Sequence, residues 1–381
     1  MTVTAGTDWT SWYAERAGRM LDELGSLVRI ESPSRDAEGI REIVRWFERE
    51  LARTGAHVEV IDEHVHGPNL VARFGEDADP ILLVGHTDTV WPRGTLERMP
   101  WRVDGDAAFG PGVFDMKAGC LVVLEAIRGL AEHGHRTPLT VVFNCDEEIG
   151  SASSRSIIER EAREARAVLV FEPALPGGRA KTSRSGVANY HVAVTGRAAH
   201  AGVDPDKGIS AIGAAAGVVT RVHALNDLAN GLSINVGVIR GGTRSNVIAA
   251  HAELEIDVRF RRAEQAGVVD LAIRDIAGDH NGARIDVTGG IDRPPFERTP
   301  HVVELFERAA RAANQSGFEL GEGHVGGASD GNFTAALGIP TLDGLGVDGM
   351  GAHADHEQIV VADLPRRPAM LVRLLLDLAS T

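Results

Sequence analysis

Three short apolar runs constrain the fold of this chain more than any other feature, because a histidine or an acidic residue follows each run within two positions. The runs are 81–85, 139–144 and 167–171, and segments with helical spacing separate them. Strands that alternate with helices predict an α/β domain with a mixed, largely parallel and buried sheet. The polar residues after the runs are of the types that form hydrolytic zinc sites.

Hydrophobic spacing predicts the remaining elements of this α/β domain. Helices are predicted where apolar residues recur near helical spacing, and strands where short runs are rich in β-branched residues. In the N-terminal part the predicted helices are 9–29, 38–54, 119–133 and 151–163, and the further strands are 58–61 and 69–74. In the C-terminal part the predicted helices are 301–316, 330–337 and 365–379, with a loop at 321–329 and a strand at 340–345.

The pattern changes between residues 187 and 293. There the order is strand, helix, strand, strand, helix, strand, which is typical of a ferredoxin-like α+β domain. The sequence therefore predicts a discontinuous α/β domain, 1–186 and 294–381, into which a second domain, 187–293, is inserted. The elements of the inserted domain are predicted at 187–195, 208–224, 233–240, 251–260, 264–279 and 283–288.

Composition excludes several classes of partner. The formal net charge of −15 disfavours nucleic-acid backbones and anionic membranes. No apolar run approaches the roughly 18 residues of a membrane span, and the N-terminal residues do not resemble a signal peptide. Both cysteines, Cys120 and Cys145, lie in apolar segments and are predicted to be buried thiols. We therefore expect a cytoplasmic enzyme that acts on a small molecule.

His86 and Asp88 follow the first apolar run. Neutral imidazole is a common zinc ligand, and a carboxylate often holds its second nitrogen atom. Because residues two apart on a strand point to the same side, Asp88 could support His86 in this way. The alternative is a hydrogen-bonded histidine that ends a strand without a metal.

Asp115 follows a glycine-rich segment, 110–114, and precedes a predicted helix. As a metal ligand it would use both oxygen atoms and bridge two ions about 3.5–4 Å apart. Aspartate is also a favoured helix N-cap residue, which is the alternative interpretation. For the nearby Lys117, the alternative interpretation is a solvated residue in the first turn of the helix.

Three acidic residues and a histidine complete the candidate site. Of the neighbours Glu147 and Glu148, one could bind metal while the other accepts a proton from an activated water molecule. Glu172 ends the third run, where a buried carboxylate is costly unless it is paired or bound to metal. His353 lies in a glycine-rich segment and is preferred as a ligand over His356, which we expect to face solvent.

Taken in order, these stretches resemble the di-zinc aminoacylase and carboxypeptidase family. That family includes glutamate carboxypeptidase, acetylornithine deacetylase, succinyl-diaminopimelate desuccinylase and peptidase T, and the resemblance is closest to the glutamate carboxypeptidase branch. It runs from about residue 20 to the C-terminus. The stretches that carry it are 85–92, 110–119, 144–151, 171–173, 196–202, 245–248, 257–259 and 351–357.

The resemblance implies a zinc-exopeptidase-like catalytic domain with two Zn²⁺ per subunit, for which Co²⁺ or Mn²⁺ could substitute. It implies that Glu147 is the general base and later the proton donor, that Asp88 supports the ligands, and that the peptide bond after Asp115 is cis. The implied ligands are His86, Asp115 and Glu172 for one ion, and Asp115, Glu148 and His353 for the other.

The resemblance implies that the inserted domain acts as a lid and forms the contact between the subunits of a homodimer. His200 would reach the site of the neighbouring subunit and stabilise the oxyanion. Four further residues match positions that contact substrate: Arg259, Arg293, Asn246 and Ser185. Two converging arginines would suit a dicarboxylate such as glutamate, because guanidinium binds carboxylate bidentately. An arginine that only caps a strand edge is the alternative for Arg259.

The resemblance therefore implies a metallocarboxypeptidase or amidase that cleaves the amide bond to a C-terminal amino acid, glutamate, in peptides, folate-like compounds or N-acyl amino acids. One alternative is an N-acyl-amino-acid deacylase of the acetylornithine deacetylase or succinyl-diaminopimelate desuccinylase type. A second is a metal-binding or scaffolding protein without catalytic activity.

Overall fold

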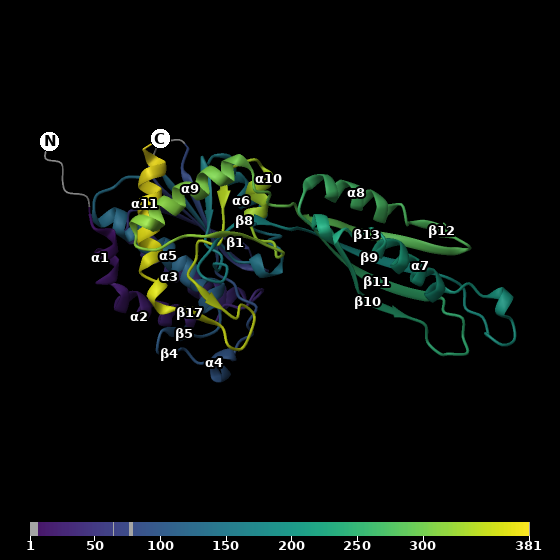
Figure 1. Cartoon of the computed structure of the whole chain (residues 1–381). Helices are drawn as coiled ribbons and strands as arrows, with labels where there is room; N and C mark the ends of the chain where they lie inside the picture. Colours follow the sequence, from purple (N-terminus) through teal and green to yellow (C-terminus); the bar gives the residue numbers. More distant parts are fainter. Residues whose placement is uncertain (1–6, 64, 76–78, 381) are drawn as a thin grey trace. The chain divides into compact units, whose positions relative to one another are not determined.

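The structure is a computed structural model that describes residues 7–63, 65–75 and 79–380. It divides the chain into two compact units, many of whose helices and strands are labelled in Figure 1. The first unit comprises Met1–Ser183, Arg298–His324 and Ser329–Thr381, and the second comprises Arg184–Glu297 and Val325–Ala328.

A six-stranded sheet forms the centre of the first unit. Its strands lie in the order β1 (His57–Glu63), β2 (Gly67–Phe74), β6 (Leu139–Asn144), β3 (Ile81–His86), β7 (Ala167–Val170) and β15 (Thr341–Leu342). The last four are parallel to one another, whereas β2 is antiparallel to both of its neighbours, β1 and β6. The predicted mixed, largely parallel sheet is confirmed.

Helices cover both faces of this sheet, which explains why its strands are apolar along their whole length. Leu83 and Leu169 face one helical layer, whereas Leu82 and Val84 face the other. The first layer contains α2 (Ala17–Val28), α3 (Ala37–Arg53), α5 (Ala118–Glu132), α9 (Pro300–Gln315) and α11 (Arg366–Ala379). The second contains α6 (Arg155–Arg163), which contacts α10 (Gly331–Ala336).

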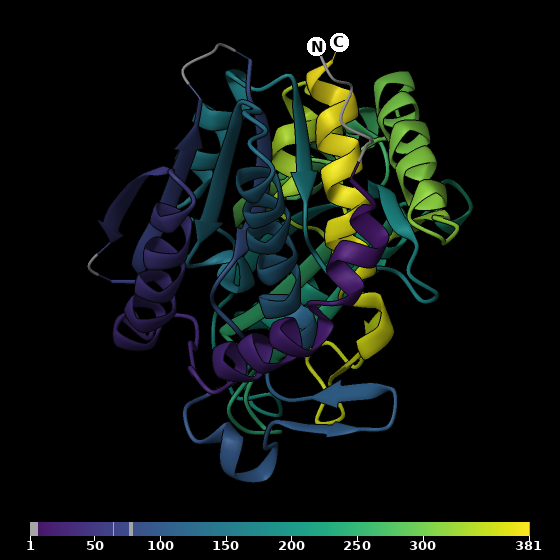
Figure 2. The same cartoon turned by 90° about the vertical axis from the view of Figure 1, so that its left-hand side faces the viewer.

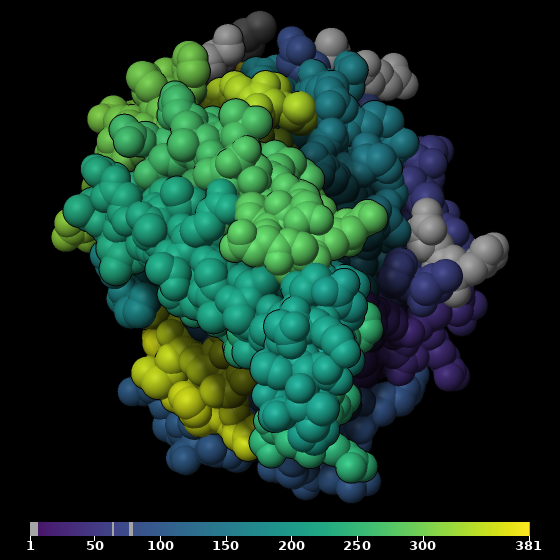
Figure 3. Space-filling model, turned by 90° about the vertical axis from the view of Figure 1, so that its right-hand side faces the viewer, coloured from purple at the N-terminus to yellow at the C-terminus, as the bar shows by residue number. Residues whose placement is uncertain are grey.

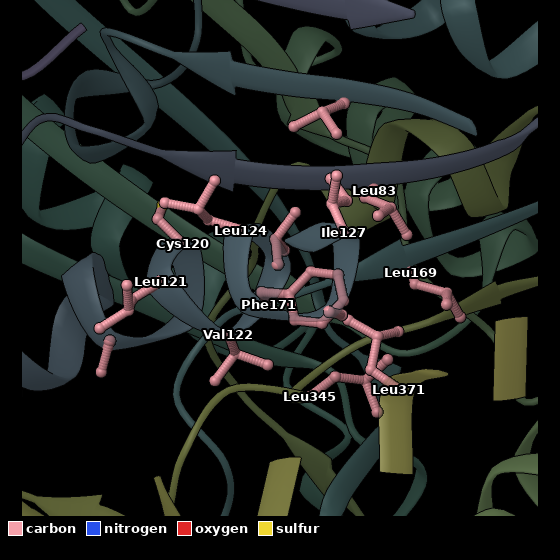
Figure 4. Close-up of a cluster of buried hydrophobic side chains, with 14 of the residues drawn as sticks. Leu83, Cys120, Leu121, Val122, Leu124, Ile127, Leu169, Phe171, Leu345 and Leu371 are labelled. Carbon is pink, nitrogen blue, oxygen red and sulfur yellow. The ribbon is translucent and has the colours of Figure 1, made fainter. Parts of the chain in front are cut away.

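The first helical layer is densely packed around α5. Figure 2 shows α11 in yellow beside α1 (Trp9–Ala14) in purple. In Figure 4, side chains of α5, β3, β7 and α11 gather into one buried cluster. Gly119 permits this close packing, because a Cβ atom there would lie only 2.1 Å from the carbonyl oxygen of Phe171. Cys120 and Cys145 are both buried, as predicted.

A second, smaller sheet in this unit has the order β16 (Gly349–Met350), β17 (Gln358–Val360), β5 (Ala107–Phe109) and β4 (Arg102–Asp104). Strands β5 and β17 are antiparallel, and Phe109 lies opposite Gln358. The segment after β5 and the segment before β17 therefore leave the pair at the same end. The remaining short elements are α4 (Thr95–Arg98) and the pair β8 (Ala180–Arg184) and β14 (Glu322–Val325).

The predicted ferredoxin-like order of the second unit is confirmed, with one short additional strand, β12, before the last strand. Its elements are β9 (Gly186–Thr195), α7 (Ala211–His223), β10 (Ser233–Gly241), β11 (His251–Phe260), α8 (Ala263–Arg274), β12 (Gly278–His280) and β13 (Ala283–Arg293). The antiparallel sheet has the order β10-β11-β9-β13-β12, and α7 and α8 pack on one of its faces. Figure 3 shows the surface of this unit in teal and green.

Several predicted boundaries are wrong, and tertiary contacts explain them. The helix predicted at 9–29 is divided into α1 and α2, because Trp9 and Tyr13 are buried in an aromatic cluster that sets the direction of α1. The helix predicted at 151–163 begins only at Arg155, since residues 153 and 154 donate to Asp146. The helix predicted at 264–279 ends at Arg274, where the chain turns into β12.

Three differences affect the C-terminal elements. The strand predicted at 283–288 extends to Arg293, because β13 stays paired with β9 beyond a bulge. The predicted loop 321–329 contains β14, and the strand predicted at 340–345 shortens to Thr341–Leu342. In the described residues, no helix combines the length and the hydropathy that a membrane span requires.

Candidate metal centre

Three adjacent parallel strands bring the first candidate residues together. His86 is the last residue of β3, the middle strand of the group β6-β3-β7. Glu147 and Glu148 lie in a short turn after β6, and Glu172 lies two residues beyond β7. After β3 the chain first forms β6 on one side of β3 and then β7 on the other side of β3. Such a switch point at the carboxyl ends of parallel strands is where α/β proteins bind ligands.

The small sheet supplies the other two residues. Asp115 lies in the turn Val113–Lys117 after β5, and His353 precedes β17. The cis peptide bond predicted between Asp115 and Met116 is present. His353 has a φ of 60°, in the left-handed region that residues other than glycine seldom adopt. An uncommon backbone conformation of this kind often marks a functional residue.

Asp115 lies at the centre of the resulting cluster. Its Oδ1 is 3.1 Å from Nε2 of His86, and its Oδ2 is 3.4 Å from Nε2 of His353. The imidazole of His86 is also 3.7 Å from Oε1 of Glu172, and that of His353 is 3.1 Å from Oε2 of Glu148. The structure therefore contains two groups of three side chains that share the carboxylate of Asp115. One group is His86, Asp115 and Glu172, and the other is Asp115, Glu148 and His353.

Glu147 lies beside the first of these groups. One of its carboxylate oxygens is within 4.8 Å of ligand-type atoms of both His86 and Glu172. Its backbone N–H donates to Oδ1 of Asp88 at 3.2 Å. Glu147 is thus held next to the cluster, while its neighbour Glu148 points to His353.

The pKa shifts within the cluster indicate that its surroundings favour positive charge. Burial alone would lower the pKa of His86, yet hydrogen bonds to Asp115 and Asp88 raise it well above its usual value. Contacts with Asp115 and Glu148 raise the pKa of His353 to about 10. Burial would raise the pKa of Asp115, but His353 and His86 hold it far below its usual value. Burial raises the pKa of Glu148 to about 7, although His353 opposes this.

These residues fit a pair of divalent cations. Imidazole nitrogen and carboxylate oxygen are the ligands that zinc and related ions take in proteins. In the described part of the chain, the buried Oε1 of Glu148 has no hydrogen-bond partner. A buried carboxylate oxygen without a partner is costly, and a bound cation would remove that cost.

Asp88 contacts His86 and also supports the two glutamates. We expected its carboxylate to hold the second nitrogen of His86, but the backbone oxygen of Asp88 is closer to Nδ1, at 2.9 Å against 3.5 Å. Strand β3 ends at His86, so the alternation of a strand does not extend to Asp88. The buried carboxylate also accepts from the backbone N–H groups of Glu147 and Glu148, at 3.2 Å each.

Sequence reasoning missed two residues near the cluster, Glu357 and Lys181, and offered a wrong alternative for a third, Lys117. Glu357 is buried and accepts from the backbone N–H of Asp115 at 3.0 Å; its only sequence signal was its place four residues after His353. Lys181, in β8, lies 3.9 Å from Glu172 and gave no signal. The solvated alternative for Lys117 is wrong, because burial lowers its pKa to about 8 and its Nζ donates to the oxygen of Ile30. His356 is exposed, as predicted.

The other candidate residues belong to the second unit, whereas the cluster belongs to the first. His200 is exposed, and the N–H of Ala201 donates to the oxygen of Asn246 at 3.0 Å, so these two candidates lie on adjoining segments. Ser185 is buried, and its N–H donates to the oxygen of Val325.

The two candidate arginines lie on either side of strand β9. Arg259 on β11 and Arg293 on β13 are both opposite Val187, so they are on the same face of the sheet. This is the face away from α7 and α8, because the neighbouring Ala188 belongs to the core beneath those helices. Arg259 is half-buried and binds Asp257 with two nitrogen atoms, whereas Arg293 is buried.

Comparisons with known proteins show what this chain is similar to. The model of peptidase family M20/M25/M40 matches residues 82–377, a range that contains every residue of the cluster. The chain is 36% identical over 373 residues to carboxypeptidase G2 of Pseudomonas sp. (strain RS-16), covering 95% of this chain and 89% of that protein. It is 31% identical over 231 residues to acetylornithine deacetylase of Klebsiella pneumoniae (strain 342), covering 56% and 58%.

A solved structure supports the same relationship. The crystal structure of aminopeptidase PepT from Bacillus cereus superposes with a TM-score of 0.80 at 26% sequence identity. The match covers 94% of this chain and 98% of that structure. The similarity therefore includes both units of the chain.

Proposed function

Because the chain belongs to peptidase family M20/M25/M40 and is a metal-dependent hydrolase, we propose that it uses two zinc ions to cleave the amide bond to a C-terminal glutamate. The observation that carries this proposal is the position of Asp115, whose two oxygen atoms face two separate histidines. A carboxylate shared in this way suits a pair of ions that act on one substrate.

In this proposal, His86, Asp115 and Glu172 hold one ion, and Asp115, Glu148 and His353 hold the other. When bound, the ions supply Lewis acidity, which lowers the pKa of water towards about 7 and polarises the scissile carbonyl. Asp88 positions both glutamates through their backbone N–H groups.

Glu147 moves the proton. It accepts a proton from the attacking water while the water oxygen bonds to the carbonyl carbon. It then gives this proton to the leaving nitrogen as the carbon–nitrogen bond breaks, so that the products are a carboxylic acid and a free amino acid. The place of Glu147 beside His86 and Glu172 supports this role.

Glutamate is proposed as the released residue because of the two arginines that flank Val187. Arg259 and Arg293 would bind carboxylates of the substrate, with Ser185 and Asn246 as further contacts. Arg259 already binds Asp257, so its guanidinium is oriented before the substrate arrives. The similarity to carboxypeptidase G2 over nearly the whole chain also favours a C-terminal amino acid as the leaving group.

A substrate panel tests this proposal. We expect zinc-loaded protein to hydrolyse an N-acyl-glutamate with a kcat/KM about 10–100-fold above that of the matching N-acyl-glutamine, since a hydrogen bond to a charged group contributes about 1.5–3 kcal/mol. Folyl-glutamate and N-acetylornithine belong in the same panel. Equal rates for the glutamate and glutamine compounds would contradict glutamate specificity. A preference for N-acetylornithine would favour a deacylase, the second candidate, which the similarity to acetylornithine deacetylase supports.

His200 is proposed to stabilise the oxyanion in the site of a partner subunit. Replacing His200 by alanine is expected to lower kcat by about 10²–10³-fold, the usual effect of removing one oxyanion donor, with metal content unchanged. Steady-state kinetics and metal analysis measure this. An alanine variant with kcat near that of the wild type would contradict the role.

Subunit mixing distinguishes action between subunits from action within one. Dimers formed from His200→Ala and Glu147→Gln chains would contain one intact site if His200 acts on its partner, and roughly a quarter of all sites would recover after random re-association. Mixed chains that stay as inactive as each variant alone, or a wild-type protein that is fully active as a monomer, would exclude this arrangement.

A further inference from the structure

Glu357 accepts four hydrogen bonds next to the metal cluster, yet it is in neither group of three. Its side chain is buried, with 1% of the residue exposed. Oε1 accepts from the backbone N–H groups of Phe114 and Asp115, at 2.9 and 3.0 Å. Oε2 accepts from the N–H of Gly112 at 2.9 Å and from Nε1 of Trp91 at 2.6 Å. One side chain therefore binds three backbone groups of the turn that carries Asp115.

The backbone of Glu357 belongs to the segment that carries the second histidine. Glu357 directly precedes β17 and follows His353 by four residues. Its own N–H donates to the oxygen of Ala354 at 2.9 Å, and the N–H of Ala354 donates to the oxygen of Gly351 at 2.8 Å. This segment is therefore a tight turn, and the carboxylate at its end joins it to the turn of Asp115.

The chemistry of these contacts requires a carboxylate. All four groups are N–H donors that cannot accept a hydrogen bond, so they need four lone pairs in a small volume. A buried carboxylate is tolerated only when it is bound in this way.

We propose that Glu357 is a positioning residue that sets the placement of Asp115 relative to His353 and thereby forms the second metal position. The Oδ2 of Asp115 and Nε2 of His353 are 3.4 Å apart on two segments that are distant in sequence, and Glu357 joins these segments. Glu357 contacts neither substrate nor metal in this account. The inference rests on the proposed metal-dependent function.

Glu357→Gln tests this inference with almost no change in volume. The NH₂ group of glutamine would replace one acceptor oxygen and would face two N–H donors. The turn of Asp115 should therefore shift. We expect the affinity for the second Co²⁺ ion to fall about 10–100-fold, as is usual when support for a ligand is lost. We also expect the visible absorption of bound Co²⁺ to change and kcat to fall more than KM changes. Co²⁺ titrations and steady-state kinetics measure these effects.

Two control variants separate positioning from general stability. Glu125→Gln also alters a buried carboxylate, which binds Arg19 and Arg128 away from the cluster. It should lower the Tm without changing the Co²⁺ spectrum. Trp91→Phe removes one of the two donors at Oε2 and leaves every backbone contact, so its Co²⁺ affinity should stay within a few-fold of wild type. A Glu357→Gln protein that behaves like Glu125→Gln, with a lower Tm only, would overturn the inference.

The same measurements distinguish a failure of this inference from a failure of the proposed function. Wild-type protein that binds two Co²⁺ ions but hydrolyses no compound of the panel would contradict the proposed function. The effect of Glu357→Gln on the titration would then still decide the positioning role. Conversely, an active wild type with an unchanged Glu357→Gln titration would contradict the positioning role alone.

Discussion

Replacing Glu147 by glutamine is expected to lower kcat by about 10²–10⁴-fold, the usual contribution of a general acid–base group, while both metal ions stay bound. The amide has nearly the same size as the carboxylate but cannot take a proton from water. Glu147 lies within 4.8 Å of ligand-type atoms of His86 and Glu172, and the proposed groups of three do not include it. Steady-state kinetics with an N-acyl-glutamate and metal analysis of the same sample measure the two parts of this prediction.

Glu148→Gln is the matched control, because it makes the same chemical change at the next residue. Glu148 contacts His353 and has a buried oxygen without a partner among the described residues, so its amide variant should bind the second ion more weakly. Excess metal should therefore partly restore Glu148→Gln but not Glu147→Gln. The reverse pattern of rescue would show that the roles of the two glutamates have been exchanged.

The second large effect is expected for Asp115→Asn. Aspartate offers one oxygen to each side of the cluster, whereas asparagine keeps one acceptor oxygen and places an NH₂ group at the other position. The variant should hold at most one ion, and its activity should fall to that of the metal-free protein even with zinc in excess. Metal content per chain, measured together with kcat, tests this prediction.

A surface variant on the same scaffold provides the control for Asp115→Asn. Asp355 lies near His353 in sequence but is exposed and pairs with Arg98. Asp355→Asn should leave metal content and kcat near the wild-type values. If Asp115→Asn retained two ions and normal turnover, the two groups of residues would not depend on a shared carboxylate.

Much of the fold could be predicted because burial gives a clear sequence pattern. Strands β3 and β6 are continuous apolar runs, since helices cover both faces of the sheet. The polar residues at their ends, such as His86 and Glu148, were therefore recognisable. The ferredoxin-like unit was recognisable for the same reason, as buried residues of β11 alternate strictly with exposed or half-buried ones.

What could not be predicted depends on contacts between distant segments. Strands β5 and β17 have only three residues each, too few for a periodic pattern, yet their pairing brings Asp115 towards His353. From the sequence, only the family resemblance joined these two residues. The role of Glu357 depends on backbone N–H groups, which every residue except proline carries, so no residue type identifies it.

Strand register and loop geometry could not be predicted from the sequence either. That Arg259 and Arg293 both lie opposite Val187 follows from strand pairing and a bulge in β13, not from their spacing in the chain. The carboxylate of Asp88 binds two backbone N–H groups after β6 because the loops of β3 and β6 adjoin in parallel register.

The most direct test of this account is to locate the metal ions in crystals of the zinc-loaded protein by anomalous scattering. The account predicts two peaks per chain, about 3.5–4 Å apart, with the carboxylate of Asp115 between them. One peak that involves only one of the two histidines, or no peak at this position with zinc in excess, would contradict it.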